Sequence, residues 1–214
     1  MGVPVIIYGR SGTGKSRSLL NFGEDEIYLI NVMGKPLPFR KGFKYTSVTA
    51  EPETIKKGLL KMPVRTAVID DAGYLMTERF MQGHGGKQAD QFKIYNDIAD
   101  IMYEMMRLIQ TQLPRDAIVY LMMHEDVSEY GDSKLRTLGK LLEQKVCLEG
   151  LATIVLHSVI TPDGYRFKTQ GSAQDVAKSP EEMFPDLLID NDLKAVDTAI
   201  RDYYGMGGGG DGTA

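Results

Sequence analysis

The sequence predicts an α/β fold: a mainly parallel sheet with helices on both faces and a C-terminal antiparallel hairpin at one edge. Three observations lead to this fold class. Short apolar runs rich in β-branched residues recur along the chain, as is typical of strands that are buried on both faces. These runs occupy residues 3–8, 27–32, 66–70 and 117–123. Helical segments separate them, which favours parallel strands, and a late turn containing Pro and Gly favours a hairpin.

In the first half of the chain, the first strand leads into a glycine-rich turn. A helix is expected directly after that turn, over residues 15–22, and it should end near Gly23. Residues 43–48 are a further strand candidate. Residues 51–60 are expected to form a helix, because Pro52 fits the first helical turn.

The longest predicted helix covers residues 89–112, after a loop over residues 83–86. Its apolar residues keep a helical period: Phe92, Tyr95, Ile98, Ala99, Met102, Met106 and Ile109. Pro114 closes the helix. The methionines of this segment are interpreted as core filling rather than as a groove for a partner.

In the last third, residues 137–145 are expected to form a short helix. Residues 152–160 and 165–169 flank the turn Thr161-Pro162-Asp163-Gly164 and should form the hairpin. A last helix is expected over residues 193–204. The glycine-rich tail at residues 205–214 is expected to be disordered.

The composition is typical of a globular domain, with 43% apolar and 25% charged residues among 214. A chain of this length supports one buried domain, expected over residues 1–204. The 25 basic and 29 acidic residues give a net charge of −4. Such a balance does not by itself indicate a nucleic-acid binder, although a local basic stripe can act alone.

The chain carries no sign of membrane insertion or secretion. No apolar run approaches the roughly 20 residues that a membrane-spanning helix needs. The first residues lead directly into a strand and lack the layout of a signal peptide. Cys147 is the only cysteine, which excludes an internal disulfide and fits a reducing cytoplasm, the expected location.

The turn after the first strand fits the phosphate-loop pattern G-x-x-x-x-G-K-[ST] at every fixed position. Its residues are Gly9, Arg10, Ser11, Gly12, Thr13, Gly14, Lys15 and Ser16. Glycines allow the backbone N–H groups to wrap closely around phosphate, and the helix that follows adds its positive N-terminal end. Lys15 brings a charge to the β- and γ-phosphates and Ser16 offers a ligand for Mg²⁺, so the motif predicts ATP as the ligand.

Two acids follow the strand at residues 66–70. Asp70 would lie at the edge of the sheet where ligands bind in open α/β folds, and there it can hold magnesium directly or through water. Asp71 has two interpretations: it orients or deprotonates an attacking water, or it is a solvated turn residue before Ala72 and Gly73.

His124 follows the strand at residues 117–123 and also has two interpretations. At the end of that strand it could contact the γ-phosphate and take part in catalysis with Lys15. Alternatively, it is a histidine that is merely hydrogen-bonded at a strand end. His84 and His157 lack neighbours with metal-ligand spacing and are interpreted as loop and strand histidines.

Several segments resemble one known group of proteins. They are residues 8–16, 68–76, His124, 137–142, 167–170 and 177–180. In these segments the chain resembles the phage-encoded RecA-like P-loop ATPases, which are phage nucleotide-binding proteins of an AAA type and include single-strand-annealing recombination proteins. The resemblance implies a RecA-like core, ATP with Mg²⁺, and homo-oligomers that act on single-stranded DNA, with a single-strand-binding protein, in phage recombination or replication.

One departure from that group concerns water activation. RecA-type enzymes usually carry a glutamate near the end of the strand after the phosphate loop, whereas this chain has Asn31 in residues 28–32 and no acid. Hydrolysis is therefore less firmly expected than binding. A nucleotide-switched binding module with negligible turnover remains an alternative, and a small-molecule kinase is a third, although the arginines do not cluster as they do in a kinase lid.

Basic residues give two candidate contact surfaces. Lys134, Arg136 and Lys140 could insert into the site of a neighbouring subunit or grip a DNA backbone. The resemblance places residues 126–136 in a loop that faces DNA or a neighbouring subunit. The plain alternative is a solvated loop with flanking acids. Arg166 and Lys168 share one face of a strand and could extend a basic track.

Overall fold

The sheet of this protein has nine strands in the part of the chain that the computed structural model describes, residues 1–84, 90–139 and 146–206. The strands are β1 (Val3–Gly9), β2 (Ile27–Asn31), β3 (Tyr45–Val48), β4 (Thr66–Asp70), β5 (Ile118–Val127), β6 (Ser133–Leu135), β7 (Ile154–Thr161), β8 (Gly164–Lys168) and β9 (Leu188–Asp190). Their order is β3-β2-β4-β5-β1-β7-β8-β9, with β6 paired to β5 alone. The first six strands in that order run parallel to one another. Strand β8 pairs antiparallel with β7, and β9 pairs antiparallel with β8. This confirms the predicted α/β class with a mainly parallel sheet.

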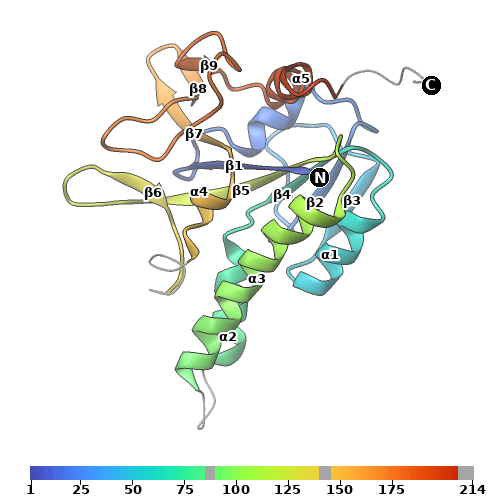
Figure 1. The fold of residues 1–214 in the computed structure, drawn as a ribbon, viewed down its shortest axis with the longest axis vertical. Helices are drawn as coiled ribbons and strands as arrows, with labels where there is room; N and C mark the ends of the chain where they lie inside the picture. Colours follow the sequence, from blue (N-terminus) through green and yellow to red (C-terminus); the bar gives the residue numbers. More distant parts are fainter. Residues whose placement is uncertain (85–89, 140–145, 207–214) are drawn as a thin grey trace.

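Helices cover both faces of this sheet (Figure 1). They are the 3₁₀ helix η1 (Ser16–Asn21) and the α-helices α1 (Pro52–Leu60), α2 (Tyr74–Gly83), α3 (Gln91–Gln112), α4 (Leu148–Leu151) and α5 (Leu193–Tyr203). One buried cluster packs α1, α2, α3 and α4 against the sheet, and a second packs η1 and α5 against the opposite face. The sheet is therefore apolar on both sides, which explains the continuous apolar runs in its strands.

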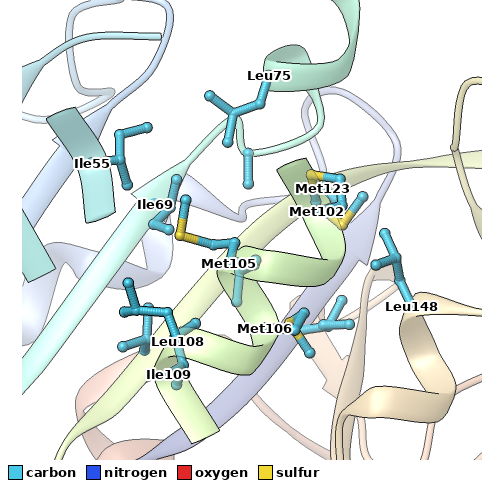
Figure 2. Close-up of a cluster of buried hydrophobic side chains, with 14 of the residues drawn as sticks. Ile55, Ile69, Leu75, Met102, Met105, Met106, Leu108, Ile109, Met123 and Leu148 are labelled. Atoms are coloured by element: carbon cyan, nitrogen blue, oxygen red, sulfur yellow. The ribbon is translucent and has the colours of Figure 1, made fainter. Parts of the chain in front are cut away.

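The long helix α3 fills the first of these two clusters. Met102, Met105 and Met106 are fully buried, and Figure 2 shows Met105 near Ile69 of β4 and Met102 near Met123 of β5. Unbranched thioether side chains fit irregular gaps between a helix and a twisted sheet. The interpretation of these methionines as core residues is confirmed.

Two predicted features near the strand ends differ from the structure. The helix expected over residues 15–22 is only the six-residue 3₁₀ helix η1, in which the Ser18 hydroxyl donates to the Lys15 carbonyl at 2.6 Å and competes with regular helical bonding. The strand expected to stop at residue 123 continues to Val127 and pairs with β6. Residues 126–136 therefore include the end of β5, the loop at residues 128–132 and β6, because β6 supplies partners for the extended backbone.

Other differences lie in short elements and at the C-terminus. Residues 137–139 of the expected helix over 137–145 are not helical, and residues 140–145 lie outside the described residues. Helix α2 and strand β9 were not anticipated, because α2 lacks a side-chain N-cap and β9 is only three residues long. The tail prediction falls mainly on residues 207–214, which also lie outside the described residues. No helix in the described ranges is long and apolar enough to cross a membrane.

A buried carboxylate ties α5 to the strands that carry the acids and His124. Asp197 accepts hydrogen bonds from Thr66 Oγ1 at 3.0 Å and from Tyr120 Oη at 3.1 Å. Arg201 Nε donates to the other carboxylate oxygen at 2.7 Å, and Arg201 also donates to Thr66 Oγ1. Because every oxygen of Asp197 has a partner, the buried charge is compensated.

We expect Arg201→Ala to lower the free energy of unfolding by about 3–5 kcal/mol, because it leaves the Asp197 carboxylate buried without its cation. Arg65→Ala is the matched control, since Arg65 pairs with Asp116 on the surface and exposed pairs contribute about 1 kcal/mol or less. Urea denaturation measures both variants. Equal, small losses in the two proteins would contradict the assigned role of Asp197.

Candidate functional site

A cavity of about 490 Å³ opens at the carboxyl ends of β1, β2, β4 and β5. Its polar lining comes from the loop after β1 with the start of η1, from the turn after β2, from the end of β4 and from β5: Ser11, Gly12, Gly14, Lys15, Ser16, Arg17, Lys35, Asp70, Asp71 and His124. Strand β5 lies between β1 and β4, and Gly9 pairs in register with His124. The sheet therefore brings the glycine-rich loop, the two acids and His124 to one edge, as expected for ligand sites in open α/β sheets.

The loop can hold its shape only with glycine at particular positions. Gly14 has φ +97°, and a Cβ there would lie 2.9 Å from both Tyr165 Cδ1 and Asn191 Oδ1. A Cβ on Gly9 would lie 2.4 Å from the Ser158 carbonyl oxygen of β7. The Ser158 hydroxyl donates to the Thr13 carbonyl at 2.8 Å and fixes the loop to the sheet. These positions match the fixed glycines of the phosphate-loop pattern.

Lys15 lies buried beneath this loop. Its Nζ donates to the carbonyl oxygens of Gly9 and Arg10, both at 2.7 Å. Burial lowers the pKa of Lys15 to about 8, against the opposing attraction of Asp71 and Asp70. A buried ammonium that is held only by carbonyl oxygens favours an anionic ligand nearby.

Ser16 and Asp70 meet at the floor of the cavity, where Ser16 Oγ donates to Asp70 Oδ1 at 3.0 Å. Burial raises the pKa of Asp70, and the hydrogen bond from Ser16 opposes that rise. A hydroxyl and a carboxylate at this separation suit Mg²⁺, which takes few protein ligands when phosphates and waters complete its shell. The described residues contain no cluster of three or more His, Cys, Asp or Glu side chains that would hold a metal alone.

Asp71 belongs both to a turn and to the cavity. It adopts the left-handed conformation, with φ +62°, and its carbonyl accepts the N–H of Tyr74 at 2.9 Å. Its carboxylate lies 2.7 Å from Lys35 Nζ and 3.4 Å from His124 Nε2. Burial alone would raise the pKa of Asp71, but His124 and Lys35 lower it below its usual range. The group is thus a weak base, better suited to orienting a water than to deprotonating it.

His124 stands between the acids and the loop. Its ring packs edge-on against Tyr74, with the ring centroids 5.7 Å apart. Nε2 is buried and, within the described structure, forms no hydrogen bond, although it lies 3.4 Å from Asp71 Oδ1. A buried ring nitrogen without a partner is costly unless a ligand satisfies it. This geometry favours the ligand-contact interpretation over a histidine that is simply hydrogen-bonded.

The cavity lining is also partly apolar and aromatic. Tyr165 of β8 packs over Gly14, and the Arg17 guanidinium lies 5.2 Å from the Tyr165 ring centroid. The other apolar lining residues are Leu20, Pro36, Pro38 and Phe39. Such a surface suits a flat ring. Sequence reasoning missed Tyr165 at this site, because only the folding of the hairpin brings it over the loop.

Arg10 differs from the rest of the loop because its side chain turns to β5. Its Nε lies 3.1 Å from Glu125 Oε1, and Glu125 Oε2 accepts from Ser133 Oγ at 2.6 Å. His157 Nε2 lies 2.7 Å from the same oxygen, and its ring stacks on Tyr8. His157 is thus a packed strand histidine, as predicted.

The predicted basic residues do not form one track. Lys134 and Arg136 are exposed on the β5–β6 side, whereas Lys140 lies outside the described residues. Arg166 pairs with Asp190 at 3.2 Å, and Lys168 pairs with Asp175. The charges on β8 are therefore largely compensated by neighbouring acids.

Comparison of the sequence with protein-family models and with curated proteins gives no match. The resemblance to phage RecA-like ATPases therefore stays a prediction that rests on the sequence segments given above.

We expect the stability of the ligand-free protein to rise with pH because of Lys15. Its pKa is about 8 in the folded chain and ordinarily 10.5, so between these values the unfolded chain binds more protons. Lys15 should therefore add up to about 1.4 kcal/mol of unfolding free energy per pH unit in that range. Urea denaturation from pH 7 to 10, compared with Lys15→Met, isolates this contribution. Parallel pH profiles for the two proteins would refute it.

Proposed function

We propose that this protein binds ATP with Mg²⁺ in the cavity after β1 and hydrolyses the γ-phosphate bond, in a RecA-like P-loop core. The observation that carries the proposal is the contact between Ser16 Oγ and Asp70 Oδ1 at 3.0 Å, beside the buried ammonium of Lys15. A loop that matches the phosphate-binding pattern and a carboxylate from a separate strand converge there, although 54 residues separate them in the chain.

Different residues of the chain would bind different parts of the nucleotide. Lys15 would exchange its carbonyl contacts for phosphate oxygens, and Ser16 with Asp70 would hold the metal. Bound Mg²⁺ neutralises charge on the terminal phosphates. Arg17 and Tyr165 would support the base. The cavity thus offers both polar groups for phosphates and an aromatic surface for a base.

Water activation is the step for which the site offers least. Asp71 is a weak base, and Asn31 stands where an acid was expected. These two observations favour the second candidate function, a binding module that ATP switches with negligible turnover. The kinase alternative gains no support. Arg107 and Arg115 lie beside residues 1–4, at the amino end of β1, whereas the cavity lies at the carboxyl ends of the strands.

The proposed biological role is the handling of single-stranded DNA in phage recombination or replication, with homo-oligomers and a single-strand-binding protein as partners. The β5–β6 hairpin supports a DNA contact. Tyr130 at its tip is 87% exposed, and Lys134 and Arg136 are exposed behind it. The hairpin extends away from the sheet (Figure 1). An exposed aromatic ring with nearby cations is typical of surfaces that bind single strands.

We expect Lys15→Ala to weaken ATP binding about 10- to 100-fold, because a charged hydrogen-bond donor to phosphate is lost. Asp70→Asn should remove most of the gain in affinity that Mg²⁺ gives. Isothermal titration calorimetry with and without Mg²⁺ measures both. Lys57→Ala, which removes an exposed lysine on α1, is the control and should bind normally. Equal affinity in wild type and Lys15→Ala would refute the site assignment.

ATP hydrolysis with and without single-stranded DNA separates the two candidate functions. We expect stimulation of hydrolysis by DNA, whereas tight ATP binding without turnover would select the binding module.

We also expect the double variant Lys134→Ala/Arg136→Ala to bind DNA more weakly. The slope of the logarithm of DNA affinity against the logarithm of salt concentration should become flatter by about 1.4, for two lost phosphate contacts. Lys57→Ala/Lys61→Ala removes the same charge elsewhere and is its control. An unchanged salt slope would exclude the hairpin as the DNA contact.

A further inference from the structure

Asn31, which stands in place of the expected acid, holds a turn. It is the last residue of β2, is 8% exposed, and pairs in register with Asp70 of β4. Its Nδ2 donates to the carbonyl oxygen of Lys35 at 2.7 Å. Gly34, at φ +64°, allows the chain to reverse within this short turn. The side chain of Asn31 therefore fixes the position of Lys35 relative to the edge of the sheet.

Lys35 presents a second ammonium group to the cavity that contains Lys15. Its Nζ lies 2.7 Å from Asp71 Oδ2 and 4.9 Å from the ring centroid of Tyr74. The charge of Lys35 is among the groups that lower the pKa of Lys15, after burial. Two cations that face one cavity beside a metal-binding pair favour a ligand with several negative charges.

The path of the chain after Lys35 indicates which end of a nucleotide it would meet. Phe39 packs with the η1 side of the core, and Lys41 Nζ lies 3.3 Å from the Leu20 carbonyl oxygen. Residues 35–41 therefore run along the cavity from Asp71 to η1. Lys35 occupies the end with the acids and His124, which the proposed function gives to the terminal phosphate.

We propose that Lys35 is a specificity-determining residue that contacts the γ-phosphate from within the same chain, and that Asn31 is its positioning residue. This inference rests on the proposed nucleotide function. In the ligand-free protein, Asp71 takes the place of the phosphate oxygens, because its carboxylate accepts the hydrogen bond that a phosphate would accept. ADP has no γ-phosphate, so it leaves the Lys35–Asp71 pair in place, whereas ATP competes for Lys35.

The test compares the dissociation constants of Mg²⁺–ATP and Mg²⁺–ADP by calorimetry. Lys35→Ala is expected to weaken ATP binding about 10-fold and to change ADP binding less than about twofold, so that the preference for ATP is lost. Lys35→Arg should keep the preference, and Lys57→Ala should change neither constant. Lys15→Ala should weaken both ligands, which distinguishes the two lysines.

Asn31 is tested through its dependence on Lys35. Asn31→Ala should also reduce the ATP preference, and the double variant Asn31→Ala/Lys35→Ala should lose no more than Lys35→Ala alone. Additive losses would show that Asn31 acts independently and would overturn its positioning role. If Lys35→Ala weakens ATP and ADP equally, or neither, the inference fails while the nucleotide site stands. If the wild type binds neither nucleotide, the proposed function fails and the inference fails with it.

Discussion

Parallel pairing of β1, β5 and β4 is the constraint on which the site depends. Parallel strands end at the same edge of the sheet. The loop after β1, His124 in β5 and the acids at the end of β4 therefore lie close together, although they are far apart in the sequence. The two apolar faces of the sheet hold these strands in register by packing against helices on both sides. Displacing one strand by a residue would turn its side chains to the opposite face of the sheet, away from the helices against which they pack, and would separate the pair Ser16 and Asp70.

The parts of the site that sequence predicts are those whose chemistry is local. Gly14, Lys15 and Ser16 follow a motif in which spacing fixes geometry, and Asp70 follows the general rule for acids at strand ends. Lys35 carries no such signal, because a lone lysine in a loop is common and its relevance arises from a turn that Asn31 closes. Tyr165 is likewise brought to the loop only by tertiary folding.

The predicted elements that differ from the structure also depend on contacts that the local sequence pattern does not show. The pattern after the loop resembled an α-helix, but a hydroxyl that bonds its own backbone and the nearby Gly23 leave a short 3₁₀ helix. Polar residues after Met123 suggested the end of a strand, yet β5 continues, since antiparallel pairing with β6 satisfies its backbone. Local composition could not anticipate a partner strand that follows later in the chain.

Most side chains that would hold the proposed nucleotide are hydrogen-bonded within the protein. Lys15 holds carbonyl oxygens, Ser16 holds Asp70, and Lys35 holds Asp71. Ligand binding would therefore exchange hydrogen bonds instead of creating them, and its net gain would come from the stronger charge of phosphate.

Strand β5 has side-chain contacts both with the cavity and with the β5–β6 hairpin. His124 faces Asp71 and Tyr74, whereas Glu125, the next residue, contacts Arg10 of the loop and Ser133 of β6. The two side chains of one strand thus touch the acids, the phosphate loop and the hairpin that carries Tyr130. A ligand that contacted His124 or displaced Arg10 would therefore act on the strand from which that hairpin extends.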